Sequence, residues 1–242
     1  MRLDKFLSEV GLGSRTEVKA LLKKKQIMVN GKVKTSPKSQ IDETRDQVTY
    51  QGQELSYEKY VYYLLNKPKG VISATDDPKH RTVLDLLDDR ARQKEVFPVG
   101  RLDKDTHGLL LLTNNGQLAY AMLSPKKHVD KVYEAEISGL MTDQDVKIFA
   151  DGIKLSDHDC QPALLSIISS DETSQTCCVQ ITIREGKFHQ VKRMVAACGK
   201  EVTDLKRLSM GPLVLDEHLA LGLYRSLTSE ELESLQIFGV EL

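Results

Sequence analysis

The sequence has 242 residues, of which 40% are hydrophobic and 29% are charged, and its formal net charge is -1. This length accommodates one large and one small domain around a sizeable core, and the composition fits a soluble globular protein. No apolar stretch is long enough to span a bilayer and the N-terminus lacks a signal-peptide core, so we expect a cytoplasmic protein.

The small net charge hides an asymmetry along the chain. Residues 1–38 contain ten Lys or Arg and three Asp or Glu, which gives a net charge of +7. The remaining residues carry 24 basic and 32 acidic side chains, a net charge of -8. A basic segment attached to a mildly acidic body indicates that the first segment meets a polyanion.

The four cysteines form no C-x-x-C pair and are interpreted as free thiols of a reducing compartment. They are Cys160, Cys177, Cys178 and Cys198. His158 lies close to Cys160 in the sequence, but two potential ligands are too few to predict a zinc site.

The first 48 residues are expected to form a small α/β module. Apolar residues at helical spacing predict a helix over residues 3–10. Ser14, with Glu17 three residues later, has the pattern of a capping box and begins a second helix. A strand is predicted at 27–29, followed by a tight turn at Asn30-Gly31. Residues 49–59 are polar without strong periodicity and are expected to be a linker.

The next segment, residues 61–65, is typical of a buried strand, and the sequence NKPKG at 66–70 turns the chain. Thr82 is expected to cap a short helix. The stretch FPVGRLDKDTHGLLLLT at 97–113 ends in an apolar run that fits a buried strand. Just before this run, Asp103 lies among alternating acids and bases. Composition alone favours a solvated loop, but a carboxylate at that position is also suited to chemistry.

Strict alternation over residues 131–138 predicts a strand in which Tyr133 shares one face with Ala135 and Ile137. On pattern alone Tyr133 is a half-buried strand residue. A helix capped by Thr142 is expected next, followed by strands around 163–168 and 176–184.

The stretch EGKFHQVKRMVAACG at 185–199 predicts a helix that ends at Gly199. Several polar and basic side chains gather at its start, where helix N-termini attract anions. They are Lys187, His189, Gln190, Lys192 and Arg193. A last strand is expected at 213–215 and a final helix capped by Thr228.

Three of these stretches, in this order along the chain, resemble the motifs of RNA pseudouridine synthases of the RsuA type. They are VGRLDKDTHGLLLLTNNG, the K-x-Y at 131–133, and the H-Q-V-K at 189–192. The first 33 residues resemble an S4 RNA-binding domain. The form H-Q-V-K-R-M and the single S4-like module resemble the family member that acts on small-subunit ribosomal RNA.

The resemblance implies roles for individual residues. Asp103 would be the catalytic nucleophile, Tyr133 an active-site tyrosine, and Lys192 the basic partner of Asp103. Without the resemblance, Lys192 would be read as an ordinary exposed helix lysine and the N-terminal lysines as a solvated face. The residues expected to bind RNA are Arg2, Lys5, Ser14, Arg15, Lys19, Lys23, Lys24, Lys25, Lys32, Arg101, His189, Gln190 and Arg193.

The expected fold class is α+β: an S4-like domain at 1–48, the linker at 49–59, and a catalytic domain at 60–242. The catalytic domain is expected to hold a mixed, largely antiparallel sheet with flanking helices. The expected function is isomerisation of uridine to pseudouridine in 16S ribosomal RNA. The expected partner is ribosomal RNA or a ribosomal precursor particle, without a membrane, and the protein is expected to be a monomer that uses no cofactor and no metal. Two alternatives are a 23S ribosomal RNA pseudouridine synthase and a non-catalytic ribosome-binding or assembly factor.

Overall fold

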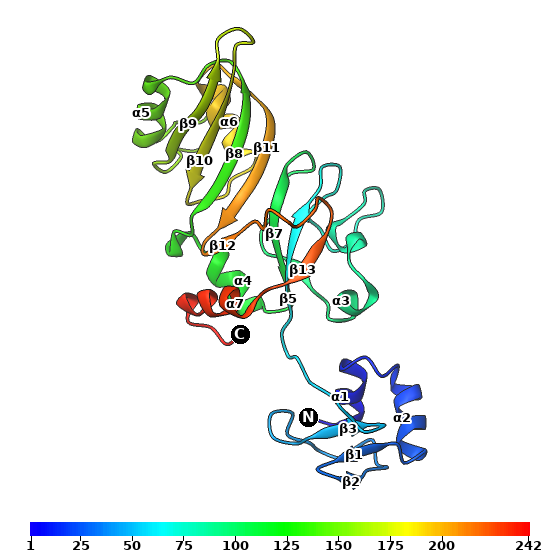
Figure 1. Ribbon diagram of the computed structural model, residues 1–242. Coiled ribbons are helices and arrows are strands. Elements are labelled where there is room, and N and C mark those ends of the chain that lie inside the picture. Colours follow the sequence, from blue (N-terminus) through cyan, green and yellow to red (C-terminus); the bar gives the residue numbers. More distant parts are fainter. The chain divides into compact units, whose positions relative to one another are not determined.

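A computed structural model describes residues 1–242 and divides into two compact units. The first unit comprises Met1–Val61 together with Asp89–Lys94, and the second comprises Tyr62–Asp88 and Glu95–Leu242 (Figure 1). None of the helices has the length and hydrophobicity that a membrane crossing requires.

The first unit packs two helices beside a small antiparallel sheet with the strand order β2-β1-β3-β4. Its elements are α1 (Leu3–Glu9), α2 (Arg15–Lys23), β1 (Ile27–Val29), β2 (Lys32–Val33), β3 (Val48–Tyr50) and β4 (Gln53–Glu54). Buried apolar residues of both helices and of β1 and β3 form one core cluster. The predicted capping box begins α2, since Ser14 N donates to Glu17 Oε2 at 2.7 Å and the Ser14 hydroxyl accepts from Glu17 N.

The segment that was expected to be a linker, residues 49–59, is largely part of this unit. Thr49 and Tyr50 pair with β1, and β4 pairs with β3. Further along, the Tyr57 ring lies 5.7 Å from the Phe6 ring. The strands are only two or three residues long, too short to give a visible alternation in the sequence.

The second unit is built on one nine-stranded sheet. Its central order is β13-β5-β7-β11-β8-β10-β9, and β6 and β12 pair with β7 and β11. The strands are β5 (Tyr62–Lys67), β6 (Phe97–Pro98), β7 (His107–Thr113), β8 (Lys131–Ser138), β9 (Leu164–Asp171), β10 (Thr176–Ile183), β11 (Glu201–Met210), β12 (Leu213–Val214) and β13 (Tyr224–Ser226). All pairs are antiparallel except β7 with β11, so the expected mixed, largely antiparallel sheet is confirmed.

Short helices flank this sheet or connect its strands (Figure 1). They are the α-helices α4 (Gly116–Leu123), α5 (Asp143–Asp151), α6 (Gln190–Ala197) and α7 (Ser229–Ser234), and the 3-10 helices η1 (Val83–Leu86), η2 (Pro125–Lys127) and η3 (Leu235–Phe238). Helix α3 (Asp89–Gln93) belongs to the first unit. Thr142 caps α5 and Thr228 caps α7, each through a capping box.

The two halves of the large sheet meet where β7 runs parallel to β11, over only two residue pairs. Gly108 is the register partner of Arg207 on β11 and of Lys67 on β5. Its φ is +101°, and a Cβ built on it would lie 2.4 Å from the carbonyl oxygen of Arg207. Since real Cβ atoms do not approach backbone so closely, this junction requires glycine.

Strand β11 was not predicted from the sequence, although it has ten residues and lies centrally in the sheet. The buried, inward-facing residues of β11 include the apolar Leu205 and the charged Arg207. The strand therefore lacks the regular apolar pattern from which a buried strand is predicted.

Gly108→Ala is expected to destabilise the protein by about 3 kcal/mol or more, because the new methyl group combines backbone strain with a clash against the Arg207 main chain. Gly116→Ala is the matched control, since Gly116 starts α4 and a Cβ there meets nothing within 4 Å. Urea unfolding of both variants checks this. Equal midpoints for the two variants would contradict the account of the junction.

Candidate active site

Asp103 lies on the loop between β6 and β7, and the backbone of this loop is fixed from the neighbouring segment. The Ser73 hydroxyl donates to the carbonyl oxygen of Leu102 at 2.9 Å and accepts from Leu102 N at 3.0 Å. Gly70 N donates to the carbonyl oxygen of Lys104 at 2.7 Å. The two residues beside Asp103 are therefore both held by hydrogen bonds.

The buried ammonium of Lys67 provides a further anchor for this loop. Its Nζ donates to the carbonyl oxygens of Pro68, Asp103 and Thr106 at 3.1, 3.0 and 2.8 Å. These three bonds use every proton of a charged lysine. Burial lowers the pKa of Lys67 to about 8, and the charges of Asp103 and Asp105 oppose that shift.

The carboxylate of Asp103 faces two basic side chains of the segment around α6. Its Oδ2 lies 3.3 Å from Lys192 Nζ, and its Oδ1 lies 3.7 Å from His189 Nε2. Lys192 also donates to Asp105 Oδ1 at 2.6 Å, and chiefly this hydrogen bond holds the pKa of Asp105 below its usual range. Lys192 therefore bridges two carboxylates, of which Asp103 is the less exposed, at 29% against 71%.

Tyr133 lies on β8, and its side chain is 8% exposed. Its register partners are Arg207 on β11 and Ile181 on β10. Residues directly opposite one another in a sheet project to the same face. Across four neighbouring strands, Lys67, Gly108, Arg207 and Tyr133 consequently form one row.

A cleft of about 1040 Å³ brings the candidate catalytic residues together above this part of the sheet. Asp103, Tyr133 and Lys192 all line it, as do Arg101 and His189. The volume is at the upper end of what small-molecule sites need, which is enough for a nucleotide with its flanking phosphates. The sequence separates these residues by up to 91 positions, and the fold places them around one space.

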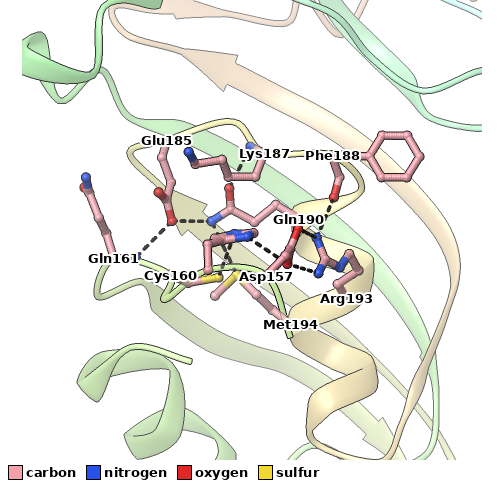
Figure 2. A network of polar contacts seen from close by, with 10 residues as sticks. Asp157, Cys160, Gln161, Glu185, Lys187, Phe188, Gln190, Arg193 and Met194 are labelled. Carbon is pink, nitrogen blue, oxygen red and sulfur yellow. Dashed lines mark hydrogen bonds and ion pairs between the residues drawn. The ribbon is translucent and has the colours of Figure 1, made fainter. Parts of the chain in front are cut away.

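Gln190 was expected to contact RNA, and the structure corrects this prediction. The residue is 4% exposed, and its amide bonds within the protein (Figure 2). Nε2 donates to Glu185 Oε1 at 2.6 Å, and the amide oxygen accepts from Lys187 N at 3.0 Å. Glu185 in turn accepts from Gln161 N at 2.9 Å. Both polar atoms of the Gln190 amide are therefore engaged within the protein, where they shape the turn before α6.

Arg193 also has an internal partner. Its guanidinium forms two hydrogen bonds with the Asp157 carboxylate, one of them at 3.3 Å between Nη1 and Oδ2 (Figure 2). The hydrogen bond from Arg193 lowers the pKa of Asp157 to about 2. Next to it, the His189 ring stacks on Phe188 at 3.8 Å, and Phe188 is 75% exposed. An exposed aromatic side chain at the cleft was not predicted from the sequence.

The residues of the first unit that were expected to bind RNA are mostly exposed and free of ion pairs. This holds for Arg15, Lys19, Lys23, Lys24, Lys25 and Lys32. Arg2 differs, because it pairs with Asp4 at 2.6 Å, and Lys5 lies 3.5 Å from Glu9. Ser14 is engaged in capping α2.

Sequence reasoning missed two buried basic residues of the cleft, Lys131 and Arg207, which are 8% and 2% exposed. A signal for Lys131 was present, since it shares the alternation of Tyr133 and so faces inward. Burial, followed by the charge of Arg207, lowers the pKa of Lys131 to about 8.

A basic module in the same chain as a cleft with a carboxylate–ammonium pair indicates an enzyme that acts on nucleic acid. The chain matches the family model described as RNA pseudouridylate synthase over residues 61–197 and the S4 domain over residues 1–48. It belongs to the RNA pseudouridine synthase family, whose members isomerise uridine in RNA.

Full-length relatives agree with this assignment. An uncharacterised RNA pseudouridine synthase, YtzG of Bacillus subtilis, is 47% identical over 97% of this chain and 98% of its own. Ribosomal small subunit pseudouridine synthase A of Yersinia pestis is 39% identical, with 97% of each chain covered. Ribosomal large subunit pseudouridine synthase B of Bacillus subtilis is also 39% identical, covering 97% and 95%. A crystal structure of a pseudouridylate synthase aligns with a TM-score of 0.67 at 35% identity, covering 97% and 99%.

Lys131→Met is expected to be more stable than the wild type at pH 7, and to lose that advantage by pH 10. In the wild type the folded state holds a buried charged lysine below pH 8. Between pH 8 and about 10.4 the unfolded state binds more protons, so wild-type stability rises with pH, and the variant lacks this rise. Urea midpoints at pH 7, 8.5 and 10 measure the difference. Lys147→Met, at an exposed position, is the control, and parallel curves for wild type and Lys131→Met would contradict the expectation.

Proposed function

We propose that this enzyme isomerises a uridine of ribosomal RNA, with Asp103 as the nucleophile. The observation that carries the proposal is the Asp103 carboxylate, held in the cleft beside Lys192 at 3.3 Å. The relatives named above for the small and large subunits support ribosomal RNA as the substrate class.

The reaction breaks the bond between N1 of uracil and C1′ of the sugar and forms a bond between C5 and C1′. C5 loses a proton and N1 gains one, so the nucleotide keeps its composition. An aspartate is ionised at neutral pH, as a nucleophile must be. Lys192 places a cation 3.3 Å from this carboxylate, and the anchored backbone around Asp103 fixes where the carboxylate points.

The target base must leave its stack to enter the cleft, at a cost of a few kcal/mol. An aromatic partner offsets part of this cost, since stacking contributes roughly 1–3 kcal/mol per base. Tyr133 is assigned this role, because its ring lies in the cleft on a rigid strand. The exposed lysines of the first unit contact phosphates, which position the protein without reading sequence.

Of the two ribosomal RNAs, we favour small-subunit RNA as the substrate, because of the sequence H-Q-V-K-R-M at 189–194. Relatives named for the two subunits are equally similar to this chain, so they support ribosomal RNA without separating 16S from 23S. A non-catalytic assembly factor is the less favoured alternative, because a pure RNA binder has no use for a carboxylate held in such a cleft.

Asp103→Asn is expected to fold normally and to lower the isomerisation rate by at least about 10³-fold, because the amide keeps the shape but lacks the nucleophilic charge. Release of tritium from RNA labelled at uridine C5 measures the reaction. Asp105→Asn is the control from the same loop. Asp105 is mostly exposed, and without its charge Lys192 still pairs with Asp103, so activity is expected to stay within about tenfold of the wild type. Wild-type release by Asp103→Asn would refute the assignment.

The double variant Lys23→Gln/Lys24→Gln is expected to weaken RNA binding and to flatten its salt dependence. Each lost phosphate contact reduces the slope of log affinity against log salt by about 0.7–0.9. The control is Lys147→Gln/Lys154→Gln, which removes two exposed lysines from the second unit. If both double variants keep the wild-type slope, the lysines of α2 do not bind phosphate and form a solvated face.

A further inference from the structure

Two buried cations lie beside Tyr133 on the floor of the cleft, and neither is needed for the roles assigned above. Lys131 precedes Tyr133 by two positions on β8, and Arg207 is its register partner on β11. Alternation along a strand and direct opposition across strands place all three side chains on one face. Ile183 and Leu205 line the same cleft with apolar surface.

Neither cation has a carboxylate within ion-pair distance, and the charges of Asp130 and Glu185 act on Lys131 only from farther away. Arg207 Nε donates to the carbonyl oxygen of Leu109 at 2.8 Å, whereas its Nη2 is buried and has no hydrogen-bond partner. Lys131 Nζ donates to the carbonyl oxygen of Val129 at 3.0 Å, which uses one of its three protons. A buried charge without a counter-ion costs several kcal/mol. Two such charges side by side therefore indicate a site that receives negative charge from a ligand.

The proposed reaction generates negative charge at this place. When the Asp103 carboxylate bonds to C1′, the bond between N1 and C1′ breaks and its electron pair leaves with the base, so the uracil becomes an anion with charge on N1, O2 and O4. The ring then turns and C5 bonds to C1′, which displaces the Asp103 carboxylate. C5 releases its hydrogen to solvent as a proton, and N1 takes up a proton. The apolar surface and the Tyr133 ring can pack against the flat uracil ring. The two buried cations, Lys131 and Arg207, can stabilise its negative charge.

We propose that Arg207 and Lys131 bind the uracil ring and stabilise it as an anion while it is detached from the sugar. This inference rests on the proposed function, since it assumes that a uridine enters the cleft. Fixed cations in a site that excludes water act most strongly on charge that develops during the reaction.

The RNA backbone is the other source of negative charge, and the distribution of cations in the cleft argues against it. The exposed cations that line the cleft are positioned to bind phosphates that remain in solvent. They include Arg101, Lys104 and Lys187. Lys131 and Arg207 lie buried in the sheet, where the base must arrive.

The test compares Arg207→Met and Lys131→Met with the wild type in three measurements. The single-turnover rate of tritium release from C5-labelled RNA, with enzyme saturating, is expected to fall about 100-fold or more in each variant. RNA affinity is expected to stay within about threefold, because the charge develops only during the reaction. Urea midpoints are expected to be unchanged or higher, because a buried unpaired charge is removed. Lys206→Met removes a charge from the opposite face of β11 and is the control.

Each other outcome has a distinct meaning. A midpoint that falls together with the rate means a structural role and overturns the inference. Weaker binding with a flatter salt slope, at an unchanged saturated rate, means that the cations hold phosphate, which also overturns it. If Arg207→Met does not fold, the same measurements are made on Lys131→Met and on Arg207→Lys, which keeps the charge. A wild-type rate of tritium release in Lys131→Met refutes the proposal. Inactivity of the wild type on every ribosomal RNA would instead refute the proposed function.

Discussion

The catalytic unit depends on the short parallel junction between β7 and β11, where Gly108 lets the Arg207 main chain approach closely. This contact joins the two halves of the sheet and places Lys67, Arg207 and Tyr133 in register across it. The loop with Asp103 enters β7 only a few residues before the junction. A position that requires glycine is thereby linked to the placement of Arg207 and Tyr133 and to the strand that the Asp103 loop enters.

Electrostatics explain how one cleft can serve both binding and reaction. Exposed cations at the cleft suit phosphates in solvent, where screening leaves each contact modest and salt-dependent. The buried lysines pay a desolvation cost, which is visible in the lowered pKa values of Lys67 and Lys131, both about 8. Lys67 recovers this cost through three carbonyl oxygens that hold the loop. Lys131 and Arg207 have no comparable compensation within the protein.

The motifs predicted the family and the fold class, because an aspartate, a tyrosine and a lysine stand in short distinctive patterns. These three residues, Asp103, Tyr133 and Lys192, line one cleft in the structure. Local signals also predicted the capped helices that begin after Ser14 and Thr142. The sequence could not reveal β11, whose inward arginine breaks the apolar alternation, nor the short strands within 49–59. It misassigned Gln190, because hydrogen bonding to Glu185 depends on tertiary contact. Buried cations are visible only once burial is known.

The most direct test of the account is to map pseudouridine in both ribosomal RNAs of cells that lack this gene, with and without a restored copy. The account predicts that one pseudouridine of 16S RNA is missing, that the wild-type gene restores it, and that the Asp103→Asn gene does not. Loss of a site in 23S RNA alone would contradict the small-subunit assignment. A full set of pseudouridines in both RNAs without the gene, or restoration by Asp103→Asn, would contradict the central claim.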